Sequence, residues 1–378
     1  MPPLSKAERK QAQAAEDSFN RTYVLQYGEE RWQQTLYSAL LAPTRYAILV
    51  NRYAVPGIPK AFSEDEAKSL QLIAFPGATE GSPDVPSSDL LTSYQWSAPE
   101  VETPSPPPQV DPTSGLMTHW NLDAASLLAV TILDPRPGDK VLDLCAAPGG
   151  KSVALSQLLR PRDFDEAAPS LAGGCLHSNE VNAGRNKRLS SNLQSYLPAP
   201  FFKSDEAKVL RLDGTEANVI HSLPLGPGGY DKVLLDAPCS SERHVIHAHA
   251  KAKQGGRVAD EMASWRSGHS KKMAKTQAAL LMTALKAVRV GGRVLYATCS
   301  LSNEENDGVI EKAKELVQKE RKKLGVKWDL TVRSGALVGK GLEQWGEPTK
   351  HGWVVLPDHP GGGRWGPLFF ALLEKAVA

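Results

Sequence analysis

The chain has 378 residues, enough for two or three domains, and 41% of them are hydrophobic, an ordinary share for a globular protein with a large core. With 44 Lys and Arg against 42 Asp and Glu, the formal net charge is only +2. Any surface for nucleic acid must therefore come from local clusters of basic residues. The four cysteines show no C-x-x-C spacing and no secretory signal precedes them, so we expect neither a metal site nor disulfides.

The first 75 residues show mainly helical patterning. Residues 1–18 mix basic and acidic side chains, which is typical of a flexible, solvated terminus or helix. They lack the apolar core of a secretion signal and carry acids that transit peptides avoid. We predict a helical region from residue 19 to residue 75, with two amphipathic helices between Phe19 and Ala54 that are broken at Pro43. We expect their aromatic residues to pack on the core.

A proline-rich segment follows. Nine prolines lie between residues 76 and 113, together with many Ser, Thr and acidic residues. This composition cannot bury enough apolar surface to order itself, so we predict a long linker or loop with extended character. Residues 114–378 are predicted to form one α/β domain, which opens with a helix from Asn121 that ends before Pro135.

The stretch Val141 to Lys151, VLDLCAAPGGK, is predicted to be a buried strand that ends in a turn and opens a helix. The turn from Ala146 to Gly150 has almost no side-chain bulk, so a ligand can approach the backbone N–H groups of the helix. A plain tight connection would look the same, and the turn alone leaves both interpretations open. The turn matches neither the G-x-G-x-x-G fingerprint of dinucleotide binders nor a Walker loop. The missing dinucleotide fingerprint argues against a nicotinamide dehydrogenase.

Three later strands are each predicted to end at an acidic residue. The strands are Gly174–Glu180, Lys208–Leu212 before Asp213 and Gly214, and Lys232–Leu235 before Asp236. Open α/β sheets bind ligands at the carboxyl ends of their parallel strands. We therefore predict that Glu180, Asp213 and Asp236 surround one site, where a carboxylate can bind the two hydroxyls of a ribose.

Two cysteines follow neighbouring predicted strands. Pro238-Cys239 comes after the fourth strand and Thr298-Cys299 after the fifth, which follows the Gly291-Gly292 turn. Beyond them, Ser302 and Glu305 form a capping-box pattern for a helix through about Leu324. The closing strands are predicted at residues 328–333, 352–356 and 368–374.

From about Phe19 onward, and most specifically in the paired Pro-Cys and Thr-Cys motifs, the sequence resembles the Nop/Sun family of RNA cytosine-5 methyltransferases. It is most similar to the short branch with the mitochondrial rRNA and tRNA enzymes, in which a pair like Arg243 and His244 follows the first motif. The resemblance implies an α/β fold with a Rossmann-like, S-adenosylmethionine-dependent methyltransferase sheet. That sheet would have seven strands with one antiparallel edge, and a short helical N-terminal extension would precede it.

The resemblance also implies a covalent mechanism. C5 of cytosine is too poor a nucleophile to take a methyl group, but a thiolate that adds to C6 pushes electrons onto C5. Cys299 matches this nucleophile and Cys239 the group that helps to release the adduct, while Asp236 would hydrogen-bond to N3 or the exocyclic amine of the base. For Cys145 and Cys175 we expect the usual fate of free cysteine, which is a small buried hydrophobe.

The cofactor contacts are assigned in the same way. Gly149, Gly150, Lys151 and Ser152 would hold the methionine end of S-adenosylmethionine, Glu180 the ribose, and Asp213 and Gly214 the adenine, with Asp236 near both cofactor and base. Arg185 matches a cofactor contact, although a solvated helix face is an equal alternative. The departures from the family pattern are conservative: Ser152 replaces Thr, Glu180 replaces Asp, and Ser241 stands where many members have Gly.

Residues 244–275 are predicted to be a long basic loop beside the site, with seven Lys or Arg against two acids from His249 onward. Such a loop could bind phosphates and stack an unpaired base, although a solvated loop without function is the alternative. The candidates for RNA contact are Arg243, Trp265, Lys271 and Lys272.

No RNA-binding module is recognisable, so we expect rRNA or tRNA selection to involve a partner such as a helical-repeat protein. We expect no membrane or DNA partner. The branch resemblance indicates mitochondria, with cytoplasm or nucleus as the alternative. An RNA-binding ribosome-assembly factor with little or no methylation role remains open. A DNA cytosine enzyme needs only the Pro-Cys thiol and amide methylation needs none, so Cys299 argues against both.

Overall fold

The computed structural model describes most of the chain. The described residues are 6–54, 62–76, 91–97, 105–161, 163–255, 257–266, 268–337 and 341–378. Most of the predicted proline-rich linker, residues 77–90 and 98–104, lies outside them, as do the first five residues of the predicted flexible terminus. Within the described residues, no helix is long and apolar enough to cross a membrane.

The N-terminal region begins with helices, and the first of them covers most of the terminus that was predicted to be flexible. They are α1 (Lys6–Tyr27), α2 (Glu29–Arg31), the π-helix η1 (Trp32–Leu36) and α3 (Tyr37–Leu41). Gly28 separates α1 from α2 with a φ of 86°, which favours glycine. As expected, the aromatic residues Phe19, Tyr23 and Trp32 pack inward, and each is at most 2% exposed.

A small antiparallel sheet follows, where a second helix was predicted. Its strands are β1 (Tyr46–Val50), β2 (Leu70–Leu72), β3 (Ser93–Trp96) and β4 (His119–Asp123), and their order in the described part of the chain is β2-β3-β1-β4. The helix prediction after Pro43 was wrong because a short apolar run fits a buried strand as well as a helix. In β1, Leu49 joins the main core while Ile48 packs on Phe62 and Trp96 on the opposite face.

Two further elements complete this region, a short helix inside the predicted helical residues 19–75 and a strand that was not predicted. The short helix α4 (Glu64–Lys68) begins with a capping box between Ser63 and Glu66. Strand β3 lies inside the segment that was predicted to be a linker, where it pairs with β1 and β2. The sequence signal for β3 is weak, because four strand residues stand among prolines and serines.

The larger sheet has nine strands among the described residues. They are β5 (Lys140–Asp143), β6 (Cys175–Asn179), β7 (Ala207–Leu210), β8 (Tyr230–Asp236), β9 (Val288–Thr298), β10 (Trp328–Val332), β11 (Glu347–Pro348), β12 (Trp353–Val355) and β13 (Leu368–Val377). Strands β7, β6, β5, β8 and β9 are parallel neighbours. Strand β13 runs antiparallel to β9. The α/β methyltransferase sheet predicted from the sequence is therefore confirmed, including the closing strands β10, β12 and β13. The short strand β11 was not predicted, and β13 is flanked by β10 and β12 instead of forming the edge.

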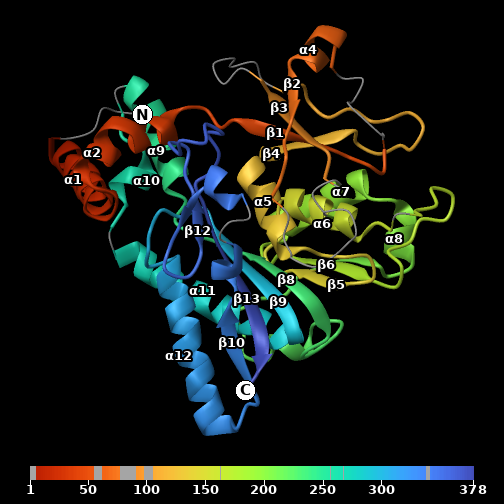
Figure 1. Ribbon diagram of the computed structural model, residues 1–378. Helices are drawn as coiled ribbons and strands as arrows, with labels where there is room; N and C mark the ends of the chain where they lie inside the picture. Colours follow the sequence, from red (N-terminus) through yellow and green to blue (C-terminus); the bar gives the residue numbers. More distant parts are fainter. Residues whose placement is uncertain are drawn as a thin grey trace.

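Helices cover both faces of this sheet, as Figure 1 shows. On one face lie α5 (Ala124–Leu133), α6 (Gly150–Leu159), α7 (Ala183–Tyr196) and α8 (Ala199–Lys203); on the other lie α11 (Gly268–Ala287) and α12 (Asp307–Leu324). Successive strand residues point to opposite faces, so Val141 joins the first core and Leu142 the second. The carboxyl ends of the parallel strands remain uncovered by these layers and form the site.

Two short helices replace the predicted basic loop. Helices α9 (Glu242–Gln254) and α10 (Asp260–Ala263), with the first turns of α11, occupy the segment 244–275. In Figure 1 they lie beside α1, across the molecule from α7 and α8. The loop prediction failed because the segment is rich in His, Lys and Gly, yet Val245, Ile246 and Met262 form a buried stripe against the N-terminal aromatic residues. Helix α12 also starts later than predicted, at Asp307, because Glu305 turns inward instead of capping it.

Candidate functional site

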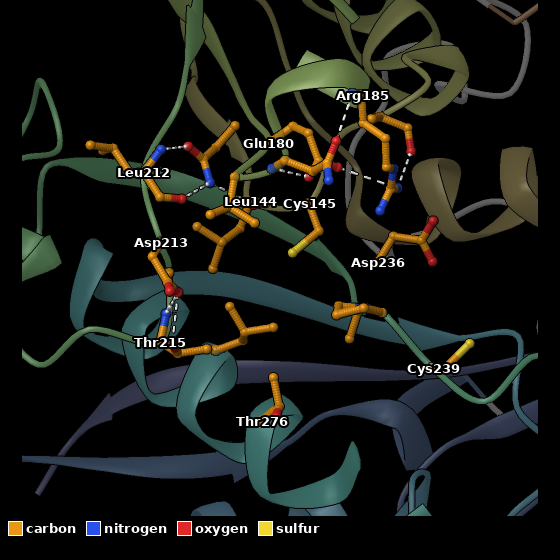
Figure 2. A pocket seen from close by; sticks show the side chains of 18 of the residues that line it. Leu144, Cys145, Glu180, Arg185, Leu212, Asp213, Thr215, Asp236, Cys239 and Thr276 are labelled. Carbon is orange, nitrogen blue, oxygen red and sulfur yellow. Dashed lines mark hydrogen bonds and ion pairs between the residues drawn. The ribbon is translucent and has the colours of Figure 1, made fainter. Parts of the chain in front are cut away.

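A cavity of about 630 Å³, here called the main cavity, lies at the carboxyl ends of β5, β6 and β8. Figure 2 shows Glu180 and Arg185 on its upper wall, Asp213 and Thr215 toward one end, and Asp236 and Cys239 toward the other. The predicted site residues that line it are Glu180, Arg185, Asp213, Gly214, Asp236, Cys239 and Cys299. The convergence of strand-end acids predicted from the sequence is thus present in the structure.

Of the small-residue turn between β5 and α6, Ala147 lines this cavity, whereas Gly149, Gly150 and Lys151 do not. Gly150 and Lys151 line a smaller adjoining cavity of about 120 Å³ together with Trp120 and Asp236. A Cβ atom on Gly150 would lie 2.8 Å from Trp120 Nε1, so only glycine fits there. Ser152 is fully buried and its hydroxyl donates to Asp143 at 2.7 Å, so it supports the turn and cannot itself touch a ligand.

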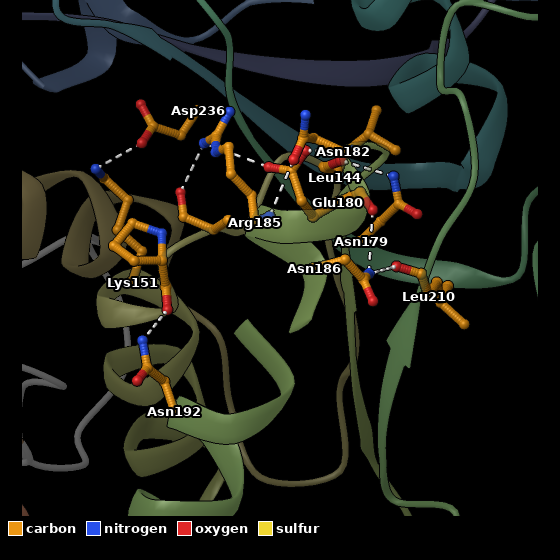
Figure 3. Close-up of polar contacts among 12 residues, drawn as sticks. Leu144, Lys151, Asn179, Glu180, Asn182, Arg185, Asn186, Asn192, Leu210 and Asp236 are labelled. Carbon is orange, nitrogen blue, oxygen red and sulfur yellow. Dashed lines mark hydrogen bonds and ion pairs between the residues drawn. The ribbon is translucent and has the colours of Figure 1, made fainter. Parts of the chain in front are cut away.

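Polar side chains hold this turn in place. Arg185 donates to the carbonyl of Ala147 at 3.0 Å and Asn192 to that of Pro148 at 2.8 Å (Figure 3). Beneath the turn, burial raises the pKa of Asp143 to about 7. The turn is thus fixed from α7 on one side and from β5 on the other.

The middle of the cavity presents a buried carboxylate. Glu180 is 4% exposed; its carboxylate accepts the backbone N–H of Asn182 at 2.8 Å and forms a 3.3 Å ion pair with Arg185. Asn179 donates to the carbonyls of Leu144 and Leu212 and ties the ends of neighbouring strands together. Arg185 therefore orients Glu180 and the turn at once, and its position in the lining favours the predicted cofactor contact over a purely solvated helix face.

The far end of the cavity is shaped by Asp213 and Gly214. Asp213 accepts the backbone N–H and the hydroxyl of Thr215 at 2.9 and 2.6 Å, and these hydrogen bonds lower the pKa of Asp213. A Cβ atom on Gly214 would lie 2.7 Å from Leu280 Cδ2 on α11. A larger residue at this position would therefore collide with Leu280, which together with Gly214 lines this end of the cavity.

At the opposite end the two thiols are in contact. The sulfurs of Cys239 and Cys299 lie 3.0 Å apart, and both cysteines are free. The hydrogen bond from Cys239, helped by the Ser241 hydroxyl, lowers the pKa of Cys299 against the effect of burial. The same hydrogen bond, with burial, raises the pKa of Cys239. The geometry therefore favours a thiolate on Cys299 and a protonated thiol on Cys239.

Asp236 stands between these thiols and Lys151. The ammonium of Lys151 lies 2.7 Å from Asp236 Oδ2. Burial lowers the pKa of Lys151, but the charge and hydrogen bond of Asp236 outweigh that effect, and the pKa is raised. Lys151 therefore lies beside Asp236, near the two thiols, and does not line the main cavity.

A second cavity, of about 360 Å³, opens on the other side of this group. It shares Asp236, Ser241 and Cys299 with the main cavity. Its remaining wall includes Thr44, Asp123, Lys151, Arg243, His244, His247 and Pro367. Thr44, Asp123 and His247 were not predicted, and the sequence carries no signal for them, because they come from three separate segments.

Of the four residues predicted to contact RNA, two are buried and two are exposed. Trp265 is buried against Phe19, with ring centroids 5.3 Å apart, so the prediction that it stacks on an RNA base was wrong. Arg243 is also buried and donates to the backbone carbonyls of Ala42 and Gly366, which makes it a structural residue of the second cavity. Lys271 and Lys272 are exposed on α11 and line neither of these two cavities.

The other two cysteines also lie where their strands place them. Cys175 is buried at the start of β6, whereas Cys145 borders the main cavity. Burial raises the pKa of Cys145 and raises that of Cys175 to about 11, so both stay protonated and unreactive. Within the described residues, no group of three or more His, Cys, Asp or Glu side chains could hold a metal ion.

Comparison with known proteins gives a consistent result. The 16S rRNA methyltransferase RsmB/F family matches residues 130–344. A mouse mitochondrial tRNA (cytosine(34)-C(5))-methyltransferase is 32% identical over 96% of this chain and 90% of its own length. The mouse 5-cytosine rRNA methyltransferase NSUN4 is 32% identical over 79% of this chain and 73% of its own length.

Solved structures share the fold over nearly the whole chain. The crystal structure of NSun6 from Pyrococcus horikoshii with SFG has a TM-score of 0.61 and 17% identity, and covers 96% of this chain and 98% of its own. A methyltransferase homologue from the same organism has a TM-score of 0.56 and 21% identity, and covers 99% of this chain and 100% of its own. At these identities the likeness concerns the fold alone.

Proposed function

This chain belongs to the RsmB/F family of S-adenosylmethionine-dependent RNA methyltransferases, and from this premise we propose that it methylates C5 of a cytosine through a covalent bond between Cys299 and C6. The family and the cofactor predicted from the sequence are thereby confirmed. The observation that carries the covalent mechanism is the contact of two thiols, 3.0 Å apart, on the wall where two cavities meet.

The main cavity suits the cofactor. Its buried carboxylate, Glu180, is placed to bind ribose hydroxyls, and the Asp213-Gly214 end offers a flat, partly apolar wall for an adenine ring. When bound, S-adenosylmethionine supplies a methyl group on a positively charged sulfur. Asp236 lines the same cavity at the end that holds the two thiols.

The second cavity suits the target base. It shares Cys299 and Asp236 with the cofactor cavity, so a cytosine bound in it would lie within reach of both the thiol and the methyl donor. Asp236 would accept a hydrogen bond from the exocyclic amine, and Lys151 would hold the Asp236 carboxylate in that orientation. A base in this cavity must be flipped out of any stack, which single-stranded RNA permits at low cost.

The two thiols then act in turn. The thiolate of Cys299 forms a bond to C6 while the C5–C6 electron pair moves to C5. C5 then takes the methyl group, and the electron pair of the broken S–CH3 bond stays on the donor sulfur, which becomes neutral. Cys299 is now a neutral thioether, so the hydrogen-bonded sulfur anion that raises the pKa of Cys239 is gone. Cys239 can lose its proton to solvent and accept the C5 proton as a thiolate. The C5–H electron pair re-forms the double bond, and the C6–S bond breaks and returns its electrons to Cys299.

The test is transfer of label from S-adenosylmethionine into RNA that is then digested to nucleosides. We expect label in 5-methylcytidine with the unmodified chain and none with Cys299→Ala. Label in another nucleoside, or undiminished label with Cys299→Ala, would contradict the proposal. Calorimetry of cofactor binding to Cys299→Ala is the control, because its cofactor cavity should remain intact.

The target is rRNA, as the family match suggests, with tRNA as the second candidate because the tRNA relative matches 96% of this chain. The predicted mitochondrial location agrees with those relatives. Mitochondrial rRNA and tRNA offered separately to the enzyme discriminate between the targets.

A helical-repeat protein partner stays a proposal, which the near-neutral charge of the chain supports. Faster methylation on addition of organellar extract would support it further. The alternative of a factor that binds RNA without methylation predicts binding but no 5-methylcytidine.

A further inference from the structure

Two acidic residues lie buried directly behind the thiols. Glu242 and Glu305 are each fully buried, and among the described residues neither forms an ion pair with a cation. Burying carboxylates costs free energy unless hydrogen bonds satisfy them. Each carboxylate accepts several hydrogen bonds, and the donors reveal what the pair does.

The hydrogen bonds cross between the two cysteine loops. Glu242 follows the loop of Cys239, yet it accepts from the backbone N–H of Leu301 at 2.9 Å and from the hydroxyl of Ser300 at 3.2 Å. Glu305 follows the loop of Cys299, yet it accepts from the N–H and the hydroxyl of Ser240 at 3.1 and 2.5 Å. Each acid therefore ties down the loop that carries the other acid's cysteine.

Ser240 links the two acids. Its oxygen contacts Glu242 Oε1 as well as Glu305 Oε1. A hydroxyl has one proton to donate, so it can donate to one carboxylate and must accept from the other, which then carries a proton. Burial and the neighbouring charge of Glu305 raise the pKa of Glu242. Ser240 thus joins both acids in one hydrogen-bonded chain behind the thiols.

The N-terminal helix reaches into the same network. The hydroxyl of Tyr23, on α1, donates to Glu242 Oε1 at 2.7 Å. On the next turn of α1, Tyr27 donates to the carbonyl of Leu301 at 2.9 Å. From the other side Gln277 on α11 donates to Glu305 and to the carbonyl of Pro238, both at 2.9 Å. Elements more than 200 positions apart in the sequence therefore converge on the two loops.

We propose that Tyr23, Ser240, Glu242 and Glu305 form a brace of positioning residues that holds the sulfurs of Cys239 and Cys299 in contact. This proposal rests on the function assigned above to the two thiols. The brace keeps the Cys239 thiol in place as the donor that stabilises the Cys299 thiolate. Without it the two loops can separate, and Cys299 loses that donor.

Electrostatics alone makes the opposite prediction. Asp236, Lys151, Tyr296, Glu242 and Glu305 interact electrostatically with the two thiols, and Tyr23 lies behind them. The second cavity, which Cys299 lines, adds the charged or titratable side chains of Asp123, Arg243, His244 and His247. Removing a negative charge near a thiol favours its thiolate. If Glu305 acted only through its charge, Glu305→Gln would make Cys299 more reactive. The brace predicts that Cys299 becomes less reactive, because an amide cannot accept all the donors that point at Glu305.

The experiment is alkylation of Cys299 by iodoacetamide as a function of pH in the full chain, followed by peptide mass spectrometry. We expect Tyr23→Phe and Glu305→Gln to raise the pH at which Cys299 is half-maximally reactive. Alkylation near neutral pH then slows by about tenfold for every pH unit by which this midpoint rises. The control is Tyr37→Phe, which alters a partly buried tyrosine packed on the same aromatic cluster, outside the brace.

Steady-state kinetics give a second readout. We expect both brace variants to lower kcat while the KM for S-adenosylmethionine stays within error, because the brace does not line the ribose or adenine ends of the cavity. Faster alkylation in Glu305→Gln, or alkylation in Tyr23→Phe equal to that in Tyr37→Phe, would overturn the proposal. Ser240→Ala, which changes no charge, replaces Glu305→Gln if thermal melting shows that the latter does not fold.

The two proposals fail separately. Alkylation needs neither cofactor nor RNA, so it tests the brace even if Cys299 is not the nucleophile for methyl transfer. Conversely, an unaltered alkylation profile with methylation still dependent on Cys299 would remove the brace and leave the proposed function standing.

Discussion

Gly150 allows the geometry of the turn before α6 to be tested by one methyl group. A Cβ atom on Gly150 would lie 2.8 Å from Trp120 Nε1, and Trp120 packs in turn on Tyr196 with ring centroids 4.8 Å apart. The indole therefore cannot move away freely. Overpacking of this kind costs about 1–3 kcal/mol, whereas replacing glycine in a helix gains about 0.4–1 kcal/mol through the unfolded chain. We expect Gly150→Ala to lower the free energy of unfolding by roughly 1–2 kcal/mol.

The matched control is Gly268→Ala. Gly268 is likewise the first residue of its helix, α11, but a Cβ atom there would meet nothing within 4 Å. We expect this variant to be as stable as the unmodified chain or slightly more so. The assay is urea unfolding, with calorimetry of S-adenosylmethionine binding, which should weaken only in Gly150→Ala because the turn and Lys151 shift. Equal unfolding midpoints and equal affinities for the two variants would refute this account of the turn.

Three further predictions concern charge and packing. Lys151→Met should lower kcat on the order of a hundredfold with little change in the KM for S-adenosylmethionine. The reason is that Lys151 orients Asp236 but does not line the main cavity. Steady-state kinetics test this prediction, and an effect confined to KM would contradict it. Burial raises the pKa of Asp143 to about 7, so the folded chain binds an extra proton, and stability should fall as the pH rises from about 4 to about 7. Urea unfolding across that range should show a flatter slope in Asp143→Asn. Trp265→Ala should lower the free energy of unfolding by about 3–5 kcal/mol, because it removes a buried aromatic side chain. The double variant Lys271→Ala with Lys272→Ala should leave urea unfolding unchanged and should weaken RNA binding in a salt-dependent way.

The site was predictable wherever residues follow strands. Glu180, Asp213 and Asp236 stand at the ends of three predicted strands, and the topology of parallel sheets brings such positions to one edge. The two cysteine motifs follow the same rule, and the structure places their sulfurs in contact. Local sequence and a general rule of sheet topology were sufficient for these residues.

Tertiary packing decided the elements that were missed. The run Tyr46–Val50 fits a strand or a helix equally well, and only pairing with β3 and β4 selects the strand. The basic composition of residues 244–275 concealed a few buried residues, of which Trp265 docks against α1. Composition alone therefore gave a loop where packing gives helices.

The brace behind the thiols illustrates the same limit. Glu305 stands at the position of a helix-capping residue, and the local pattern with Ser302 assigned it that role. In the fold its carboxylate accepts from Ser240 and Gln277, which are remote in sequence. A buried acid pair of this kind becomes visible only when the partners from distant segments are known.

The most direct test of the covalent mechanism is to incubate the protein with S-adenosylmethionine and RNA and then to measure its mass under denaturing conditions. With Cys239→Ala we expect a stable adduct of protein and RNA, because the C5 proton has no acceptor and the C6–S bond cannot break. The adduct should map to Cys299 and vanish in the double variant with Cys299→Ala. An adduct that persists in the double variant, or methylated RNA released at the normal rate by Cys239→Ala, would contradict the account.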